Sequence, residues 1–275
     1  MDCICIKNLE VFSKHGVFEE ENRLGQKFAI DVVLYLSTRT AGVADDIGKS
    51  VDYGSVCHFI TAFMKGHTYK LIETAAERLA EDVLIEYPLI DKILLTVKKP
   101  WAPIGLPLEE VSVQIERGWH RVFLSLGSNM GDREEHIGKA ISYLKENERI
   151  RIINESSMIE SEPYGNVNQD KFINSAIEIM TLHTPSELLT YCKNLERMAG
   201  RVKTEHWGPR PLDMDILFYD DATVDLPNLT VPHADLCNRD FVLGPLNEIA
   251  PYFRHPVNRK TVSELYKELK DKKQK

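Results

Sequence analysis

Two aspartates separated by a single residue form the sequence pattern with the clearest chemical potential. Asp213 and Asp215 lie in the segment LDMDI, whose alternation of apolar and polar residues predicts a strand over residues 212–219. Side chains two positions apart on a strand point to the same face, so both carboxylates share one face and the apolar residues take the other. Two carboxylates together with phosphate oxygens suit Mg²⁺ as ligands. Two solvated acids on an exposed face are the alternative, because acidic residues are usually exposed.

Basic residues just upstream favour a site for a phosphorylated ligand. The segment GRVKTEHWGPRPLD carries Arg201, Lys203 and Arg210 around Trp207. Arginine and lysine neutralise phosphate oxygens while metal ions bridge others, so this arrangement suits a nucleoside triphosphate. The glycines and prolines of the segment predict a loop, and such a loop can close over substrates as a lid.

Neighbouring patterns narrow the class of site. The sequence contains no GxxxxGK[ST] pattern, so a P-loop enzyme is excluded. The segment GSNMGDR, residues 127–133, is a glycine turn between a predicted strand and a predicted helix, and is a weak signal by itself. Farther downstream, His233 and Arg239 lie beside turn-forming residues in VPHADLCNRDFVLGPL and are further candidate phosphate ligands.

The second half of the chain resembles 6-hydroxymethyl-7,8-dihydropterin pyrophosphokinase. The matching segments follow the family's order: LGSNMGDR at 126–133, SEPYGNVNQDKFINSA at 161–176, LERMAGRVKTEHWGPRPLDMDI at 195–216 and VPHADLCNRDFVLGPL at 231–246. The resemblance implies pyrophosphoryl transfer from ATP to the pterin's 6-hydroxymethyl group, with release of AMP. In this reaction a primary alcohol attacks the β-phosphorus, while metal ions and guanidinium groups stabilise the developing charge.

The same resemblance implies roles for individual residues. Asp213 and Asp215 would hold two Mg²⁺ ions, and Arg201 and Arg210 would act from the lid. The ATP site would comprise Glu196, Lys203, Trp207, His233 and Arg239. The pterin site would comprise Phe172 and Phe241 on the two faces of the ring, Asn174 at its edge, and Ser161, Glu162 and Tyr164. Taken without their neighbours, the two phenylalanines are more typical of a core than of a ligand site.

The first half of the chain shows no metal or nucleophile pattern, but it resembles dihydroneopterin aldolase. It contains no HExxH, HxH or GxSxG pattern, which disfavours a zinc-dependent aldolase or a serine hydrolase. The matching segments are HGVFEEENRLGQKF at 15–28, VDYGSV at 51–56, LIETAAERLAEDV at 71–83 and VKKPWAPIG at 97–105. The resemblance implies cleavage of 7,8-dihydroneopterin to glycolaldehyde and 6-hydroxymethyl-7,8-dihydropterin, which is the substrate of the second activity.

The aldolase resemblance implies a site that works without a cofactor. Lys99 would be the general acid and base, Tyr53 would assist proton transfer, and Glu21 would lie near the substrate hydroxyls. Glu73, next to Ile72, would bind the pterin's amino group and ring N–H through two parallel hydrogen bonds. A partly desolvated lysine beside another cation has a lowered pKa, which suits proton transfer. A solvated lysine pair and an ordinary acid in a helix's first turn are the alternatives for Lys99 and Glu73.

Periodicity predicts an α+β chain. In the first half the order is ββααββ, with strands over 2–13, 26–38, 92–98 and 110–117 and helices over 53–67 and 73–87. In the second half we expect strands over 121–126, 150–160, 172–182 and 212–219 and helices over 132–147 and 185–199. Residues 261–273 are either a short, Lys-rich helix or a frayed tail. The two resemblances imply a ring-forming antiparallel T-fold followed by a ferredoxin-like α/β sandwich.

Length predicts two domains, and charge disfavours nucleic acid as a partner of either. A chain of 275 residues suits two domains, and the pattern restarts at Gly118-Trp119-His120, so we expect an aldolase domain over 1–118 and a pyrophosphokinase domain over 120–275. The two parts carry net charges of −5 (13 basic, 18 acidic residues) and −3 (21 basic, 24 acidic), which disfavours nucleic-acid binding. No apolar run approaches the roughly 20 residues of a membrane span, and the N-terminus does not resemble a signal peptide.

The cysteines indicate a reducing compartment. Their number, five, is odd and no CxxC occurs, which argues against a disulfide framework or a structural zinc site and favours the cytoplasm. Cys3 and Cys5 lie two positions apart in an alternating run, and we interpret them as small apolar side chains on one strand face.

The aldolase resemblance further implies a homo-oligomer, a tetrameric ring or an octamer of stacked rings, with active sites between subunits. Two other functions stay open at this point. In one, the second half is an active pyrophosphokinase and residues 1–118 form a non-catalytic oligomerisation domain. In the other, the chain is a pterin or purine sensor without turnover, which would not need an aspartate pair and several basic residues.

Overall fold

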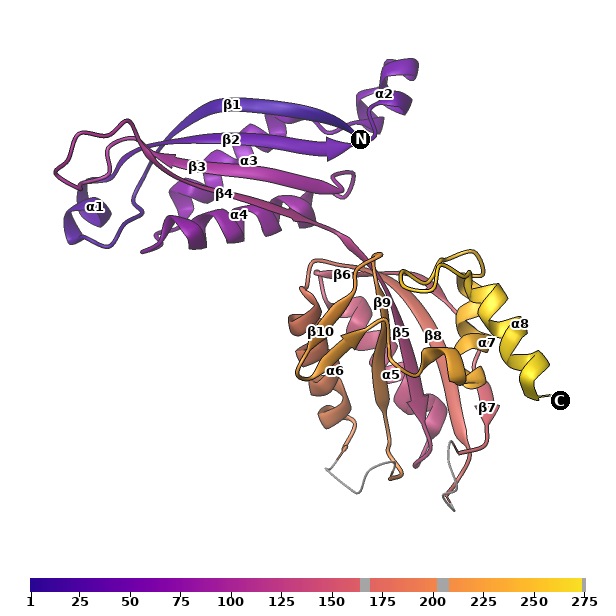
Figure 1. Cartoon of the computed structure of the whole chain (residues 1–275). Helices are drawn as coiled ribbons and strands as arrows, with labels where there is room; N and C mark the ends of the chain where they lie inside the picture. Colours follow the sequence, from indigo (N-terminus) through magenta and orange to yellow (C-terminus); the bar gives the residue numbers. More distant parts are fainter. Residues whose placement is uncertain (164–168, 202–207, 274–275) are drawn as a thin grey trace. The chain divides into compact units, whose positions relative to one another are not determined.

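The computed structural model describes residues 1–163, 169–201 and 208–273, and it divides into two compact units. The first unit spans Met1–Trp119 and the second spans His120–Lys275 (Figure 1). Each unit has its own sheet and its own buried core, so each is described by itself. No described helix is both long enough and apolar enough to cross a membrane.

The first unit is a four-stranded antiparallel sheet with two long helices on one face (Figure 1). Its strands follow the order β1-β2-β3-β4. Alternate residues of β2, among them Ile30, Val32 and Leu34, are fully buried beneath the helices, as the period of two predicts. The strands and long helices are β1 (Asp2–Ser13), β2 (Gln26–Leu36), α3 (Tyr53–Gly66), α4 (Ile72–Glu86), β3 (Lys92–Lys99) and β4 (Val111–Gly118).

Local signals account for the two long helices. The Asp52 side chain accepts a hydrogen bond from the amide of Gly54 at 2.8 Å and caps α3. The buried residues of both helices recur every three or four positions, and α4 stops before Pro88, which cannot continue a helix. Three short helices were not predicted, because each lasts only one or two turns: α1 (Glu19–Leu24), α2 (Arg39–Ala44) and a 3₁₀-helix (Ile47–Lys49).

Both outer strands of this sheet have an open edge. Within the described part of the chain, β1 pairs only with β2, and β4 pairs only with β3. β1 is 12 residues long and β4 is eight. Long open edges expose unpaired backbone groups and favour pairing with another chain.

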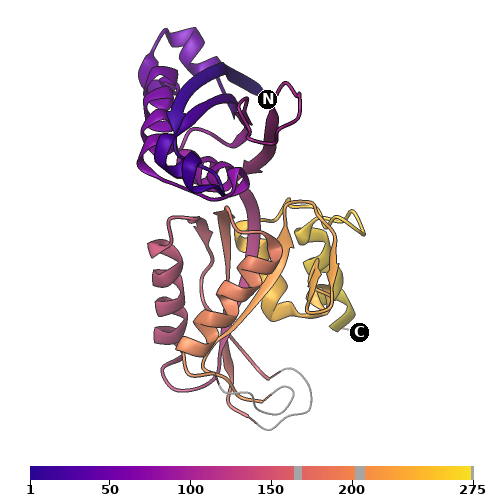
Figure 2. The same ribbon diagram turned by 90° about the vertical axis from the view of Figure 1, so that its left-hand side faces the viewer.

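The second unit is a five-stranded antiparallel sheet with helices on both faces (Figures 1 and 2). The strands follow the order β6-β8-β5-β9, and β7 pairs with the end of β8. One core packs α5 and α6 against the sheet, and a second core packs α7 and α8 against its other face. The main elements are β5 (His120–Ser128), α5 (Arg133–Glu146), β6 (Ile150–Glu155), β7 (Ile159–Ser161), β8 (Phe172–Thr181), α6 (Pro185–Met198), β9 (Asp213–Tyr219), α7 (Asp240–Ile249) and α8 (Val262–Lys273).

The structure confirms the α+β class with antiparallel sheets, but it corrects one predicted strand. Residues 150–160 form two strands, β6 and β7, that pair with different stretches of β8. The ladder breaks because the Ser156 hydroxyl accepts the hydrogen bond of the Ala176 amide, while the Ser157 amide turns to Glu248. A short hairpin of β10 (Val224–Leu226) and β11 (Leu229–Val231), a 3₁₀-helix (Leu236–Asn238) and α7 were not predicted.

Because the second unit encloses its own cores, we expect residues 120–275 to fold without the first unit. Urea unfolding of this fragment, followed by circular dichroism, should show a single cooperative transition. Its midpoint should match one of the transitions of the full chain. A fragment that is soluble but lacks a cooperative transition would show that the second unit depends on residues 1–119.

Candidate functional site

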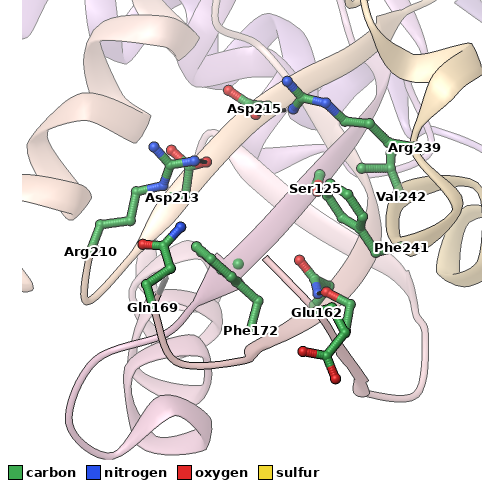
Figure 3. Close-up of a pocket in the computed structure, with 13 residues that line it drawn as sticks. Ser125, Glu162, Gln169, Phe172, Arg210, Asp213, Asp215, Arg239, Phe241 and Val242 are labelled. Atoms are coloured by element: carbon green, nitrogen blue, oxygen red, sulfur yellow. Dashed lines mark hydrogen bonds and ion pairs between the residues drawn. The ribbon is translucent and has the colours of Figure 1, made fainter. Parts of the chain in front are cut away.

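A pocket in the second unit collects residues from four strands, β5, β7, β8 and β9, and from the start of α7 (Figure 3). β5 contributes Ser125 and Gly127 to it, and β9 contributes Asp213 and Asp215. These strands lie side by side, with Gly127 opposite Asp213 and Ser125 opposite Asp215 in the register. The sheet therefore sets the spacing of the two carboxylates along one wall of the pocket.

The aspartate pair has the orientation that the strand alternation predicts. Both carboxylates reach the pocket, whereas Leu212, Met214 and Ile216 are buried in the core on the opposite face. This placement is inconsistent with two solvated acids on a flat exposed face. It leaves both side chains available to a ligand on the same side of β9.

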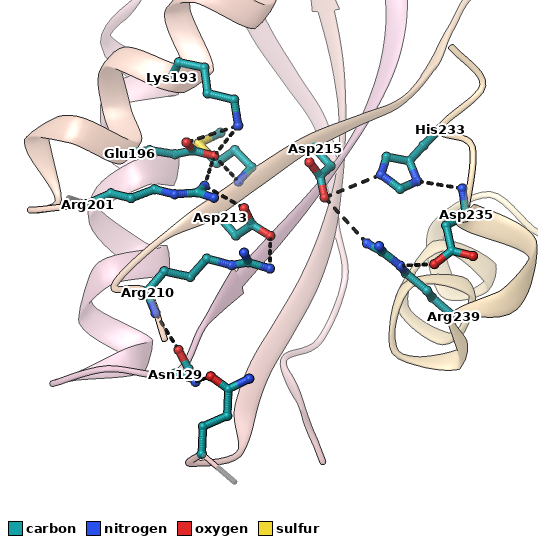
Figure 4. A network of polar contacts seen from close by, with 12 residues as sticks. Asn129, Lys193, Glu196, Arg201, Arg210, Asp213, Asp215, His233, Asp235 and Arg239 are labelled. Atoms are coloured by element: carbon teal, nitrogen blue, oxygen red, sulfur yellow. Dashed lines mark hydrogen bonds and ion pairs between the residues drawn. The ribbon is translucent and has the colours of Figure 1, made fainter. Parts of the chain in front are cut away.

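Asp213 lies between two arginines (Figure 4). Its Oδ1 atom is 2.6 Å from Nη1 of Arg201, and its Oδ2 atom is 2.9 Å from Nη2 of Arg210. Burial disfavours the charged form of Arg201, but Asp213 and Glu196 outweigh burial and raise the pKa of its guanidinium. Arg201 therefore remains charged where it contacts Asp213.

Glu196 holds Arg201 against β9 from behind. Its buried carboxylate accepts hydrogen bonds from Nη1 of Arg201 at 2.7 Å and from the amide of Met214 at 2.9 Å. Lys193 on the preceding turn of α6 also contacts this carboxylate, at 2.9 Å. Glu196 is not among the described residues that line the pocket, so its contacts favour positioning of Arg201 and β9.

Asp215 has weaker cationic partners than Asp213. Its Oδ2 atom is 3.8 Å from Nε2 of His233 and 3.9 Å from Nη1 of Arg239, whose Nε atom binds Asp235 at 2.9 Å. Burial and the neighbouring Asp213 carboxylate raise the pKa of Asp215. A cation placed beside Asp215 would relieve this repulsion.

The aspartate pair fits Mg²⁺ as a partial ligand set. Mg²⁺ commonly takes one or two carboxylates and completes its coordination with water and substrate phosphates. Among the described residues, no cluster of three or more His, Cys, Asp or Glu side chains is arranged to hold a metal. The site therefore suits an ion that arrives with a phosphorylated ligand better than a closed structural metal site.

Two aromatic rings face the pocket beside these charges (Figure 3). Phe172 begins β8 and Phe241 lies in the first turn of α7, and both line the pocket with half-exposed side chains. The guanidinium carbon of Arg210 is 5.9 Å from the ring centre of Phe172, and that of Arg239 is 6.0 Å from the ring centre of Phe241. Both rings therefore border the pocket, and Phe241 also packs against the core beneath α7.

The floor of the pocket is narrow and polar. Asn174 is buried, and its Nδ2 atom donates to Oγ of Ser161 at 2.8 Å. A Cβ atom on Gly127 would lie 3.3 Å from Oδ1 of Asn174 and 3.8 Å from the ring of Phe172. A larger side chain at Gly127 would therefore intrude on this floor, where Glu162 also lines the pocket.

Asn129, which the sequence analysis did not single out, joins two sides of the pocket (Figure 4). The side chain is 2% exposed, and its Oδ1 atom accepts a hydrogen bond from the amide of Arg210 at 2.8 Å. Its own amide donates to the Arg210 carbonyl at 3.1 Å, and its Nδ2 atom lies 3.3 Å from both Oε1 of Gln169 and the Asp170 carbonyl. One amide side chain thus fixes the segment that carries Arg210 to the segment that precedes Phe172.

Three residues that the sequence analysis assigned to this site lie outside the described residues. They are Tyr164, Lys203 and Trp207. The residues of the site that the structure brings together are Ser161, Glu162, Phe172, Asn174, Arg201, Arg210, Asp213, Asp215, His233, Arg239 and Phe241, with Glu196 behind Arg201.

The first unit contains a buried ion pair between two predicted site residues. Nζ of Lys99, at the end of β3, is 2.5 Å from Oε1 of Glu21 in α1, and both side chains are nearly inaccessible. Glu21 also accepts hydrogen bonds from Nε2 of Gln26 at 2.9 Å and from the amide of Phe18 at 3.1 Å. Burial opposes ionisation of Glu21, but Lys99 and these donors lower the pKa of its carboxyl group. A Cβ atom on Gly16 would lie 2.3 Å from this carboxyl group.

A buried histidine lies near this pair and was not predicted. His15 is fully buried, and its Nδ1 atom accepts a hydrogen bond from the amide of Tyr69 at 3.1 Å. Burial lowers the pKa of His15, and the charge of Lys99 acts in the same direction. Within the described residues its Nε2 atom has no hydrogen-bond partner. His15 is therefore a neutral polar group that belongs to the surroundings of Lys99.

Tyr53 lies far from this ion pair within one chain. It begins α3 and is 62% exposed, and the same end of the helix contacts Tyr87 through Ser55. The opposite end of α3 contacts β1, because Ser13 donates a hydrogen bond to the Met64 carbonyl. A helix of 14 residues is about 20 Å long. The chain therefore does not bring Tyr53 to Lys99 by itself.

Glu73 and Ile72 occupy the first turn of α4. Glu73 is exposed, and Ile72 is buried in the core of the first unit. Glu73 thus has the accessibility that a ligand-binding carboxylate needs, whereas the Ile72 side chain packs inward. A contact from Ile72 to a ligand would have to come from its backbone.

Comparison with known protein families gives two matches in one chain. Residues 123–251 match the family model of 7,8-dihydro-6-hydroxymethylpterin-pyrophosphokinase, and residues 4–116 match the model of dihydroneopterin aldolase. The 2-amino-4-hydroxy-6-hydroxymethyldihydropteridine pyrophosphokinase of Aquifex aeolicus is 43% identical over 143 residues, which cover 52% of this chain and 88% of that protein.

Longer relatives match both units together. Folic acid synthesis protein FOL1 of Dictyostelium discoideum is 31% identical over 286 residues, covering 94% of this chain and 43% of that protein. Folic acid synthesis protein fol1 of Pneumocystis carinii is 30% identical over 288 residues, covering 98% of this chain and 38% of that protein. The chain thus spans less than half the length of these two relatives.

The match to the Aquifex protein covers most of that protein, and the two family models match successive parts of this chain in the order of its two units. The chain therefore belongs to the 7,8-dihydro-6-hydroxymethylpterin-pyrophosphokinase family and carries a dihydroneopterin aldolase domain ahead of the pyrophosphokinase domain.

Proposed function

We propose that this protein catalyses two successive steps of folate biosynthesis. The aldolase domain, residues 1–118, cleaves 7,8-dihydroneopterin to glycolaldehyde and 6-hydroxymethyl-7,8-dihydropterin. The pyrophosphokinase domain, residues 120–275, transfers pyrophosphate from ATP to the hydroxymethyl group and releases AMP. The observation that carries the proposal is the pocket that holds the Asp213–Asp215 pair beside the rings of Phe172 and Phe241.

In this proposal the pterin and ATP bind to chemically different parts of the pyrophosphokinase pocket. The phenylalanine rings hold the flat pterin, and Asn174 and Ser161 present hydrogen-bonding groups to its edge. Two Mg²⁺ ions at Asp213 and Asp215 would offset charge on the triphosphate. Catalysis then rests on position and electrostatics, because phosphoryl groups transfer with little need for a strong protein base.

The cationic side chains act on the phosphates in this proposal. Arg201 and Arg210 form ion pairs with Asp213 in the structure. Each guanidinium group can also bind a phosphate oxygen in place of one of these contacts. His233 and Arg239 are placed near Asp215 and extend the positive charge along the pocket. Lys203 and Trp207 belong to the proposal by resemblance.

The aldolase reaction needs proton transfer and a bound ring, without a cofactor. Lys99 moves protons to and from the substrate, whose own C=N bond accepts the electron pair of the cleaved bond. Glu21 orients the amino group of Lys99 through their 2.5 Å contact, and its role in the proposal is to bind the substrate hydroxyls. Glu73 binds the pterin's donors, and Tyr53 assists proton transfer from a second copy of the chain.

The aldolase site as proposed requires a homo-oligomer, a tetrameric ring or an octamer. The separation of Tyr53 from Lys99 supports it, as do the open edges of β1 and β4. Large apolar side chains are also exposed on the segments around the Glu21–Lys99 pair, as expected of a covered surface. They are Phe12, Val17, Phe18, Leu24, Trp101, Ile104 and Leu106.

Small-molecule pterins and ATP are the partners in this proposal, with no role for nucleic acid or a membrane. A cytoplasmic location belongs to the same proposal and is supported by the five cysteines, all of which are free thiols.

Incubation with 7,8-dihydroneopterin, ATP and Mg²⁺, followed by mass analysis, tests both steps together. We expect glycolaldehyde, AMP and the pterin diphosphate. Lys99→Ala should lower glycolaldehyde release by about a thousandfold, because general acid–base catalysis contributes about 10²–10⁴-fold. Supplied 6-hydroxymethyl-7,8-dihydropterin should still be converted by this variant at the wild-type rate.

Asp215→Asn should give the opposite result, with normal glycolaldehyde release and accumulation of the hydroxymethyl pterin. Glycolaldehyde release by Lys99→Ala at the wild-type rate would instead indicate that residues 1–118 are a non-catalytic oligomerisation domain. Failure of the wild type to form AMP from the hydroxymethyl pterin would refute the second step and favour a sensor.

Asn129→Ala tests the connection between the two sides of the pyrophosphokinase pocket. Loss of the side chain frees the segments of Arg210 and Phe172, so we expect kcat to fall about 10–100-fold and KM to rise for both substrates. Steady-state kinetics with each substrate varied would measure this. Asn147→Ala is the matched control, because the Asn147 Oδ1 atom also accepts a backbone hydrogen bond, from Arg149 at 3.0 Å, but away from the pocket. Equal kinetics for the two variants would contradict the positioning role.

A further inference from the structure

Two cysteines on the edge strand β1 form a pair of thiols that neither proposed reaction uses. Cys3 and Cys5 are both exposed, and their Sγ atoms lie 3.9 Å apart. They are two positions apart on the strand, so their side chains point to the same face of the sheet. The partly buried Ile4 points to the other face, which α3 and α4 cover.

We propose that Cys3 and Cys5 form a reversible disulfide within β1 when the protein meets a disulfide oxidant such as oxidised glutathione. One cysteine thiolate attacks the glutathione disulfide, forms a mixed disulfide and releases the first glutathione thiolate. The second cysteine thiolate then attacks the protein sulfur of the mixed disulfide and releases the second glutathione. The two protein thiols lose two protons and two electrons, and one oxidised glutathione becomes two reduced molecules.

The backbone geometry of β1 permits this bond with a small adjustment. A rise of about 3.3 Å per residue places the two Cα atoms roughly 6.6 Å apart. Disulfides span Cα separations of about 4.4–6.8 Å but need Cβ separations of about 3.5–4.5 Å, so the strand must shorten or twist locally to bring the two Cβ atoms together. The pairing of β1 with β2 shifts between Ile6 and Leu9, and Asn8 in this bulge has a φ of 55°. The pairing is regular from Asp2 to Ile6, so shortening between the two cysteines displaces the pairs around Ile4, and the bulge takes up that shift before pairing resumes at Leu9.

The other cysteines lack this combination of exposure and proximity. Cys192 is fully buried in the second unit, and burial raises the pKa of its thiol to about 12. Cys57 and Cys237 are partly buried, and burial raises the pKa of each thiol. Contact with Cys5 also raises the pKa of Cys3, so its reaction should accelerate as the pH rises. Exposure and the neighbouring sulfur distinguish the pair from the other three thiols.

Titration of the full chain with oxidised glutathione, followed by intact mass and peptide mapping, tests the proposal. We expect a loss of about 2 Da, a decrease from five free thiols to three, and a bond between Cys3 and Cys5 that dithiothreitol reverses. Persistent glutathione adducts on Cys3 or Cys5, a covalent dimer through these residues, or an unmodified pair would each overturn it. None of these readouts depends on either enzymatic activity.

Single variants make the test specific. Cys3→Ser and Cys5→Ser should each abolish the loss of about 2 Da and leave a glutathione adduct on the remaining cysteine. Cys57→Ser is the matched control and should still form the bond at the wild-type rate. Formation of an equivalent bond in Cys5→Ser, or its loss in Cys57→Ser, would show that other thiols are responsible.

Discussion

The second unit depends on one electrostatic constraint, the placement of two carboxylates on one face of β9. Separated by a single residue, Asp213 and Asp215 cannot point away from each other while the strand remains regular. Their repulsion, together with burial, raises the pKa of Asp215. Arg201 and Arg210 offset the charge on Asp213, while the nearest guanidinium to Asp215, that of Arg239, is 3.9 Å away. In our proposal, this uneven compensation leaves Asp215 available to a metal ion that carries phosphates.

The rest of the second unit holds these groups in place. The core beneath β9 fixes the strand, and Glu196 connects it to Arg201 through the Met214 amide. Asn129 connects the backbone of Arg210 to the segment before Phe172. Buried hydrogen bonds therefore link the wall of the pocket that carries Arg210 to the wall that carries Phe172. A buried polar group that loses its hydrogen-bond partner costs free energy. The first unit differs, because one chain brings Glu21 and Lys99 into contact but leaves Tyr53 at the far end of α3.

Secondary structure could be predicted from the sequence wherever a hydrophobic period or a helix cap within the same segment determines it. The strand alternation around Asp213 predicted both carboxylates on one face and the buried apolar residues on the other, and helical spacing predicted α3, α4, α5 and α6 to within one or two residues. The break between β6 and β7 was missed because it arises from the Ser156 hydroxyl and Glu248, which is 91 residues from Ser157. Asn129 was missed for the same reason, since its partners lie about 40 and 81 residues away. The distance between Tyr53 and Lys99 depends on the helix direction, which no motif encodes.

The most direct test of the central claim is the Mg²⁺ dependence of nucleotide binding, measured by calorimetry with a non-hydrolysable ATP analogue. The account predicts that Mg²⁺ tightens binding to the wild type by at least about tenfold, or about 1.4 kcal/mol. It predicts that Asp215→Asn removes most of this gain and that Asp225→Asn, which alters an exposed aspartate on β10, retains it. An equal gain from Mg²⁺ in Asp215→Asn and the wild type would contradict the account.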